Sequence, residues 1–314
     1  MKRLSDQMNL VVCIAGPTAS GKSAWAIEIA KAVDGEIINA DSMQVYKELQ
    51  ILSARPGTEE MEDIPHHLFG YVPASHRYSA GQWTREATDQ IIDCLARGKV
   101  PILVGGTGLY FKALTEGLAS IPAVDKIGMD RADGLLKAGI DKLRKEAENI
   151  DPVAAARVLG NDPQRLHRIV AVAAGTANIL SEWQKDTKPV IPNRYWQGAV
   201  MLPERDMLYE RINARFEIML EDGGLDEAKA FHKLRLPRNL PAAKAIGVTP
   251  LLNHLDGKIS YDEAVSQAKR DTRRFAKRQF TWFRGQAKHW FCVKNNENKL
   301  EFRKNILKNV FDGA

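Results

Sequence analysis

The stretch that decides the fold is Gly16–Ser23, which reads GPTASGKS and directly follows the apolar run LVVCIA at residues 10–15. It matches G-x-x-x-x-G-K-[ST], the pattern of a glycine-rich loop whose backbone N–H groups surround phosphate oxygens. The run before it has the length of a strand buried on both faces, and SAWAIEIAKAV after it has apolar residues at helical spacing. We therefore expect a strand, a phosphate-binding loop and a helix, with Lys22 as a point charge and the Ser23 hydroxyl as a ligand of Mg²⁺. The alternative is a glycine-rich turn that binds nothing.

Further segments continue this pattern along the chain. GEIINADS at residues 35–42 and VPILVGG at 100–106 read as strands, and AGQWTREATDQIIDCLARGK at 80–99 reads as an amphipathic helix. YWQGAVML at 195–202 reads as a strand that closes the sheet. Alternation of strands and helices is typical of a parallel sheet with helices on both faces. The sequence predicts an α/β fold: a P-loop parallel sheet flanked by helices, with an inserted all-helical domain.

The inserted domain is indicated by residues 117–196, which read as helices without strands between them. Asp151-Pro152 and Asp162-Pro163 each begin a helix, because aspartate caps free N–H groups and proline lacks one. We expect residues 1–116 and 197–314 to form the P-loop catalytic core with C-terminal helices, and residues 117–196 to form the inserted helical domain. Helices are expected to about Trp290, and the polar tail after Asn295 carries no recognisable signature.

Composition excludes several classes of protein. The 314 residues are 44% hydrophobic and 27% charged, and the net charge of +6 suits a polyanionic partner. The three cysteines, Cys13, Cys94 and Cys292, are scattered and predict neither a disulfide framework nor a zinc site. His66 and His67 are interpreted as structural. No run approaches the ~20 apolar residues of a membrane span, and no signal-peptide pattern is seen, so we expect a cytoplasmic protein.

Asp41 is the main candidate for chemistry outside the loop. It follows a predicted strand, and ligands of open α/β sheets bind beyond the carboxyl ends of the strands. Such a carboxylate either holds Mg²⁺ through water or acts as a general base toward a hydroxyl or an amine. The alternative is an aspartate that caps the next helix. Ser42 and Gln44 beside it can hydrogen-bond the edge of a base.

The strand at residues 100–105 ends in Gly105, Gly106 and Thr107, where many P-loop hydrolases carry an acidic residue. This weakens the case for an ATPase motor. Thr107 is expected to lie across from the phosphate loop and to hydrogen-bond an oxygen there. A tight turn capped by a threonine explains the same residues.

Two basic clusters are candidates for contact with nucleic acid. Between residues 269 and 288 there are eight Lys or Arg residues and one acid, and Arg270, Arg274 and Arg278 share one helical face. The alternative is a solvated charged face. In the second cluster, Gln164, Arg165 and Arg168 stand at a helix start, where side chains and backbone N–H groups together would contact a phosphate backbone.

Taken together, the chain resembles the tRNA dimethylallyltransferase (tRNA isopentenyltransferase) family. The resemblance rests on stretches that follow the family order from about residue 13 to about residue 284, most of the chain. These are GPTASGKS, DSMQVYKELQ, IPHHL, YSAGQW, VGGTGLYFKAL, DPVAAARVLGNDPQRLHR, LYERINARFEIML and RRFAKRQFTWFR.

The resemblance implies transfer of a dimethylallyl group from dimethylallyl diphosphate to the exocyclic N6 amine of the adenine 3′-adjacent to the anticodon (tRNA position 37), releasing diphosphate. The catalytic residues it implies are Asp41 as base, with Thr107 and Arg215 acting on the diphosphate. The implied diphosphate site is Gly16, Pro17, Thr18, Ala19, Ser20, Gly21, Lys22 and Ser23, with Mg²⁺ as cofactor on Ser23. The implied contacts with the tRNA anticodon stem-loop are Asp41, Ser42, Met43, Gln44, Gln164, Arg165, Leu166, His167, Arg168, Arg270, Arg274 and Arg278.

The chain departs from the family pattern at a few positions. Ser23 replaces the usual threonine, Arg55 a lysine, and Val248 a frequent tyrosine. An arginine expected in the insertion is Met129 here, with Arg131 as the nearest substitute. Rival interpretations are a P-loop small-molecule kinase, an RNA-binding NTPase switch without transfer chemistry, and an isopentenyltransferase acting on free nucleotides. We expect a monomer, since no assembly signature is visible.

Overall fold

The computed structural model describes residues 10–311, and its centre is a parallel sheet of six strands in the order β3-β2-β4-β1-β5-β6. The strands are β1 (Val11–Ala15), β2 (Gly35–Asn39), β3 (His66–His67), β4 (Val100–Gly105), β5 (Trp196–Met201) and β6 (Phe291–Val293). The predicted α/β fold on a parallel sheet is confirmed. Because the strands are parallel, the segments that follow β1, β2, β4 and β5 lie at one edge of the sheet.

Helices cover both faces of this sheet. The chain moves from β1 to β2 in one direction and from β2 back to β4 in the other, so right-handed crossovers place α1 (Lys22–Val33) and α2 (Ala80–Ala96) on opposite faces. Trp83 of α2 stacks on Tyr110 of α3 (Gly108–Thr115) with ring centroids 4.1 Å apart, and its indole N–H donates to the Asn39 carbonyl at 2.8 Å. This packing anchors the end of β2, from which the chain continues to Asp41.

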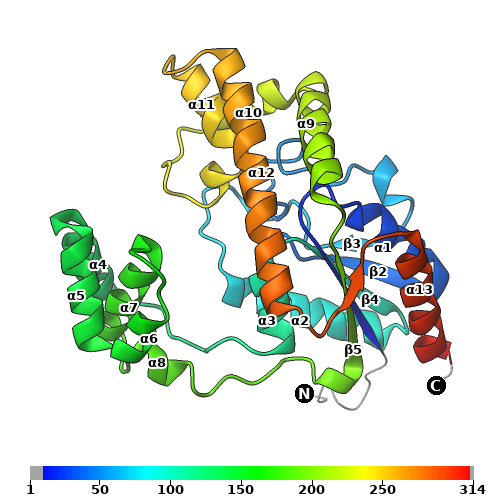
Figure 1. Ribbon diagram of the computed structural model, residues 1–314, viewed down its shortest axis with the longest axis horizontal. Helices are drawn as coiled ribbons and strands as arrows, with labels where there is room; N and C mark the ends of the chain where they lie inside the picture. The colour runs from blue at the N-terminus through cyan, green and yellow to red at the C-terminus, as the bar shows by residue number, and fades with distance from the viewer. Residues whose placement is uncertain (1–9, 312–314) are drawn as a thin grey trace. The chain divides into compact units, whose positions relative to one another are not determined.

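The C-terminal tail forms elements that the sequence did not predict. Helix α13 (Asn296–Phe311) lies beside α1 (Figure 1) and buries Phe302 and Ile306 in the same core as Trp25, whose ring centroid is 5.6 Å from that of Phe302. Leu307 and Val310 pack against the same core, so α13 docks through an apolar face at helical spacing. Strands β3 and β6 were also missed, because two or three residues at the sheet edges carry no periodicity.

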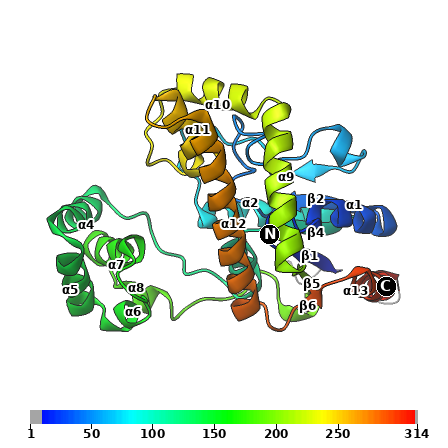
Figure 2. The same ribbon diagram turned by 45° about the horizontal axis from the view of Figure 1, so that its top comes forward.

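The segment between β5 and β6 is helical, as predicted, and is interrupted by turns. It contains α9 (Arg205–Glu221), α10 (Gly224–Lys233), α11 (Val248–Leu255) and the long α12 (Tyr261–Gln286). Helices α9 and α12 run side by side in both ribbon views (Figures 1 and 2) and are joined by an ion pair between Lys269 and Glu217 at 2.5 Å. Short 3-10 turns occur at Glu59–Met61, Asn193–Tyr195 and Ala242–Lys244.

Residues 116–190 form a compact unit of their own, distinct from the rest of the described chain. Its helices are α4 (Lys126–Ala138), α5 (Ile140–Ile150), α6 (Pro152–Ala156), α7 (Pro163–Gly175) and α8 (Leu180–Trp183). Both Asp-Pro helix starts are present: Asp151 accepts a hydrogen bond from the Ala154 N–H at 3.0 Å, and Asp162 caps α7. Leu143 and Ile169 lie in the core of this unit. Within residues 10–311, no helix is long and apolar enough to cross a membrane.

Candidate active site

The loop between β1 and α1 has the backbone geometry of a phosphate cradle. Gly21 has φ of 86° and Ala19 has φ of 62°, left-handed values that glycine adopts freely and alanine only under strain. No side chain caps α1, so the N–H groups of its first turn remain available to an anion. The hydroxyl of Ser20 is buried and has no hydrogen-bond partner among residues 10–311. Such a buried donor is suited to a phosphate oxygen.

Lys22 lies at the centre of the charges around this loop. Its ammonium donates to the Pro17 carbonyl at 3.3 Å. Burial lowers the pKa of Lys22 to about 8, Asp41 opposes this shift by attraction, and Arg215 adds to it by repulsion. Burial also lowers the pKa of Arg215, which Asp41 again opposes. The structure therefore brings these three predicted residues within electrostatic reach of one another, and a bound diphosphate would relieve the repulsion between the two cations.

Asp41 is held in a tight turn immediately after β2. Its backbone N–H donates to the Asn39 Oδ1 at 2.8 Å, and its own Oδ1 accepts from the Met43 N–H at 2.9 Å. Asn39 is fully buried and also donates from Nδ2 to the Asp41 carbonyl at 3.0 Å. Asp41 thus closes a turn and caps no helix. One carboxylate oxygen fixes the side chain, and no hydrogen bond to the other occurs within residues 10–311.

The glycine turn after β4 fits against this site. A Cβ at Gly105 would come within 2.0 Å of the Ala40 carbonyl oxygen, so only glycine allows this approach. Beyond it, the Thr107 Oγ1 accepts from the Ser42 N–H at 2.9 Å and donates to the Ser42 Oγ at 3.2 Å. Thr107 therefore stabilises the turn that carries Asp41. Its action on a diphosphate stays a prediction.

A pocket of about 220 Å³ opens beside the loop, and Asp41 lines it. Arg215 of α9 and Arg278 of α12 also line it, as do Ser42 and Met43. Its walls are largely apolar and include Leu52, Ile212, Phe216, Met219 and Phe275. Lys244 also lines the pocket, and a carboxylate and three cations in a largely apolar cavity suit a ligand that has a charged end and a hydrocarbon end.

Gln44 lies outside this lining. Its Nε2 donates to the carbonyls of Ser53 at 3.2 Å and Ala54 at 2.7 Å, and so holds the segment that forms one wall of the pocket. Contact of Gln44 with a base stays a prediction that would use its remaining amide oxygen.

Gln279 is a site residue that the sequence analysis missed. Its side chain is buried on α12, its Oε1 accepts from the Thr18 N–H at 2.9 Å, and its Nε2 donates to the Gly106 carbonyl at 2.9 Å. Gln279 thus joins the phosphate loop to the glycine turn. The signal was present, since Gln279 interrupts an apolar stripe between the buried residues Ala276 and Phe283.

The basic face of α12 divides into two parts. Arg278 lines the pocket, with its guanidinium 5.6 Å from the centroid of the Phe275 ring. Arg270 and Arg274 are exposed and do not line it, and Arg274 contacts Asp271 at 3.5 Å. RNA contact by these two stays a prediction.

In the separate helical unit, the start of α7 exposes Gln164, Arg165 and Arg168. Leu166 is fully buried in the core of that unit, so its side chain is not available to RNA. The Nε2 of His167 is 2.8 Å from the Asp133 Oδ1.

The backbone N–H groups at the start of α7 were expected to contact a phosphate backbone, and this expectation is wrong for two of them. The N–H groups of Gln164 and Arg165 each donate to the capping Asp162 at 3.1 Å. Elsewhere in the unit, Arg131 forms an ion pair with Glu146, and Met129 is exposed.

A second polar cluster lies away from the pocket. Glu36 of β2 is almost fully buried, and its Oε2 lies 2.7 Å from the His67 Nε2 and 3.4 Å from the Cys94 thiol. Although these three side chains are close enough to share a metal ion, the guanidinium of Arg97 already forms a two-point ion pair with Glu36. The cluster is therefore a neutralised structural network. The interpretation of the two histidines as structural agrees with this, although the partner of His67 was not foreseen.

Comparison with known proteins places this geometry in a family. A family model described as IPP transferase matches residues 44–286, and one described as isopentenyl transferase matches residues 8–69. The tRNA dimethylallyltransferase of Maricaulis maris (strain MCS10) is 53% identical over 284 residues, which are 90% of this chain and 92% of that protein. That of Caulobacter sp. (strain K31) is 48% identical over 89% of this chain and 91% of its own length.

Solved structures agree with the sequence comparison. The full-length tRNA isopentenylpyrophosphate transferase of Bacillus halodurans superposes with a TM-score of 0.68 at 32% identity, covering 97% of both chains. A eukaryotic dimethylallyltransferase described as acting on tRNA superposes with a TM-score of 0.77 at 28% identity, covering 88% of this chain and 70% of the other. The phosphate loop, the Asp41 turn and the glycine turn all fall within the matched regions. This chain therefore belongs to the tRNA dimethylallyltransferase family.

Proposed function

We propose that this protein transfers a dimethylallyl group from dimethylallyl diphosphate to the N6 amine of the adenine 3′-adjacent to the anticodon of tRNA, releasing diphosphate. The observation that carries the proposal is the pocket that joins the Asp41 carboxylate to Arg215 and to an apolar wall. An apolar wall accommodates a prenyl chain, whereas the γ-phosphate of ATP would place charge there.

The proposed reaction is a displacement at the first carbon of the prenyl group. The adenine N6 forms a bond to that carbon as the bond to the diphosphate oxygen breaks, and the leaving diphosphate takes the electron pair. The carboxylate of Asp41 accepts a proton from N6 through the oxygen that no described residue engages. The N–H groups of the loop, the Ser20 hydroxyl, Lys22 and Arg215 stabilise the negative charge that develops on the diphosphate.

Mg²⁺ fits this arrangement as a cofactor. It prefers oxygen ligands and retains several waters, and the exposed Ser23 hydroxyl at the start of α1 offers such a ligand next to the diphosphate site. When bound, the ion neutralises charge on the diphosphate. This chain would hold it through Ser23, with the remaining ligands coming from diphosphate oxygens and water.

The proposed RNA contacts lie on both compact units. Ser42 and Met43 in the pocket would seat the adenine after it has left its stack, a step that costs a few kcal/mol. The exposed Gln164, Arg165 and Arg168 would bind the anticodon stem-loop, and Arg270 and Arg274 of α12 would contact phosphates.

A comparison of two labelled donors tests the proposal. The protein is incubated with Mg²⁺, bulk tRNA and either radiolabelled dimethylallyl diphosphate or labelled ATP. We expect label from the prenyl donor to enter tRNA in an amount that increases with enzyme and time. Formation of ADP without prenyl transfer would instead support a kinase or an NTPase switch, and prenylation of free AMP but not tRNA would support a transferase of free nucleotides.

A further inference from the structure

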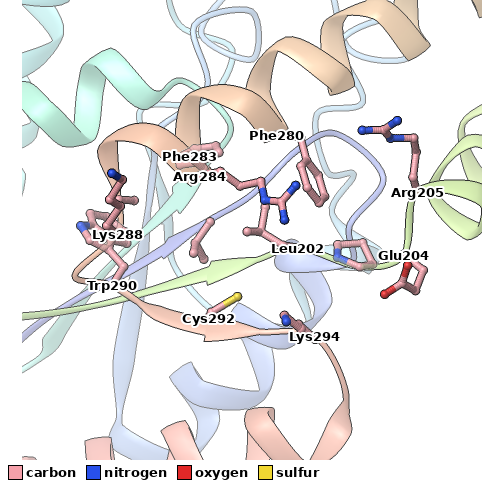
Figure 3. A pocket seen from close by; sticks show the side chains of 13 residues that line it. Leu202, Glu204, Arg205, Phe280, Phe283, Arg284, Lys288, Trp290, Cys292 and Lys294 are labelled. Atoms are coloured by element: carbon pink, nitrogen blue, oxygen red, sulfur yellow. The ribbon is translucent and has the colours of Figure 1, made fainter.

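A second pocket, of about 480 Å³, lies where the C-terminal end of α12 meets strands β5 and β6 (Figure 3). It is lined by the ends of β5 and β6 with the residues that follow them, by the last two turns of α12, and by the segment 287–290 after that helix. The Leu202 N–H donates to the Val293 carbonyl at 2.9 Å, so β5 and β6 remain joined beneath the pocket. None of its lining residues belongs to the Asp41 pocket.

Positive charge dominates this second pocket. Arg205, Arg284, Lys288 and Lys294 line it, and Glu204 is the one acid in its lining. All four cations are exposed, and within residues 10–311 none of them forms an ion pair with a carboxylate. Four unneutralised cations around one cavity repel one another, and an anionic ligand relieves that repulsion.

The floor of the pocket is apolar and firmly packed. Phe283 and Trp290 are buried, and Phe280 is half-buried under Arg284, whose guanidinium is 5.4 Å from the centroid of the Phe280 ring. The Trp290 ring packs against Phe111 with centroids 5.4 Å apart. Aromatic side chains beside cations are the combination that binds sugar and base together with phosphate.

The cations are spread along the pocket and do not converge on one point. In Figure 3, Lys288 and Arg205 lie toward opposite ends, with Arg284 between them. The lining contains no glycine and no left-handed residue, so it has no backbone cradle like that of the phosphate loop. A compact triphosphate needs converging donors. Charge distributed along a groove matches successive phosphates of a polynucleotide.

From these observations we propose that the pocket of Arg205, Arg284, Lys288 and Lys294 binds the sugar–phosphate backbone of the substrate RNA, away from the nucleotide that enters the Asp41 pocket. The inference rests on the proposed action on tRNA. Arg284 lies in the last turn of α12, and Lys288 follows the end of the helix at Gln286, both C-terminal to Arg270, Arg274 and Arg278. The proposed RNA contacts would therefore extend to the C-terminal end of α12 and the segment after it.

The test measures RNA affinity as a function of salt. Fluorescently labelled bulk tRNA is titrated with the wild type, with the double variant Arg284→Ala/Lys288→Ala, and with the control Lys299→Ala/Lys304→Ala on α13, which lies outside the pocket. Each phosphate contact contributes about 0.7–0.9 to the slope of log affinity against log salt. We expect the pocket variant to lower the magnitude of that slope by about 1.4–1.8 and the control to leave it within experimental error. Thermal unfolding of all three proteins checks that they are folded.

Two outcomes overturn the inference. One is a salt slope that is the same for the pocket variant and the wild type. The other is loss of binding to a fluorescent ATP analogue in the pocket variant with an unchanged tRNA slope, which would assign the pocket to a small nucleotide. Because binding is measured without turnover, failure of this inference is distinct from failure of prenyl transfer in the wild type.

Discussion

Replacement of Gln279 by methionine tests whether α12 positions the phosphate loop. The substitution preserves much of the side-chain volume and removes both hydrogen bonds, those with the Thr18 N–H and the Gly106 carbonyl, each 2.9 Å long. A buried backbone group that loses its partner costs about 1–3 kcal/mol. Two such groups, partly offset by the burial of an apolar side chain, lower the free energy of unfolding by about 2–4 kcal/mol. At about 2.1 cal/mol/K of unfolding entropy per residue over 314 residues, this corresponds to a decrease in Tm of roughly 3–6 °C.

The same change is expected to alter binding of the donor more than binding of RNA. Thr18 lies within the phosphate loop, so its release displaces N–H groups that would contact the diphosphate. We expect KM for dimethylallyl diphosphate to rise about tenfold or more, a loss of about 1.4 kcal/mol, while the Kd for tRNA changes less than twofold. Calorimetry and steady-state kinetics measure the two effects. The matched control is Gln286→Met, an exposed glutamine at the end of the same helix. A Gln279→Met variant as stable as Gln286→Met, with wild-type KM for the donor, would refute the reasoning.

Three further predictions follow from the charges of the site and of the core. Asp41→Asn is expected to retain tRNA affinity and to lose at least ~10²-fold in kcat, as removal of a general base does; a rate close to wild type would remove Asp41 from the mechanism. Because the pKa of Lys22 in the free protein is about 8 and its charged form binds the diphosphate, kcat/KM for the donor should fall above pH 8, by about tenfold per pH unit. Lys22→Arg should lack that decline, and an identical profile in both proteins would contradict the assignment. The hydrogen bond from Arg97 lowers the pKa of Glu36 to about 2 from 4.5, so Glu36 stabilises the fold at pH 7, and this contribution is lost as the pH falls from 4.5 to 2. Denaturant titrations of Glu36→Gln should therefore differ most from wild type near neutral pH, and a difference that grows in acid would contradict the ion-pair account.

The parts of the fold that were predictable are those with a local physical signature. The β1 strand, the phosphate loop and α1 follow from an apolar run, glycines at fixed offsets and helical spacing over consecutive residues. Helix α13 was missed although its buried face has helical spacing: Phe302 and Ile306 are buried and Leu307 and Val310 pack beside them, among lysines and asparagines that make the tail look polar. Its docking is decided by Trp25, which lies far away in the sequence.

The candidate site shows the same division between local and long-range information. Asp41 could be placed because the end of a strand is visible in the sequence, and the structure adds the turn that fixes one of its oxygens. Gln279 was recognisable as a polar residue within an apolar stripe, but its role could not be read from the sequence, since its two partners, Thr18 and Gly106, become neighbours only after the sheet forms. Leu166 was assigned to RNA through its position in a motif, but it belongs to the core of the helical unit. Proximity in a motif does not separate side chains that point outward from those that point inward.

The central claim is that the phosphate loop holds a leaving diphosphate while Asp41 takes the proton of an adenine amine. The most direct measurement is a digest of tRNA after reaction with unlabelled dimethylallyl diphosphate, in which the modified nucleoside is identified by mass spectrometry and the released diphosphate is counted. The account predicts N6-dimethylallyladenosine next to the anticodon, one diphosphate for each modified base, and neither product with Asp41→Asn within the time that wild type needs to reach completion. A prenyl group on another atom or another nucleotide, or full product formation by Asp41→Asn, would contradict it.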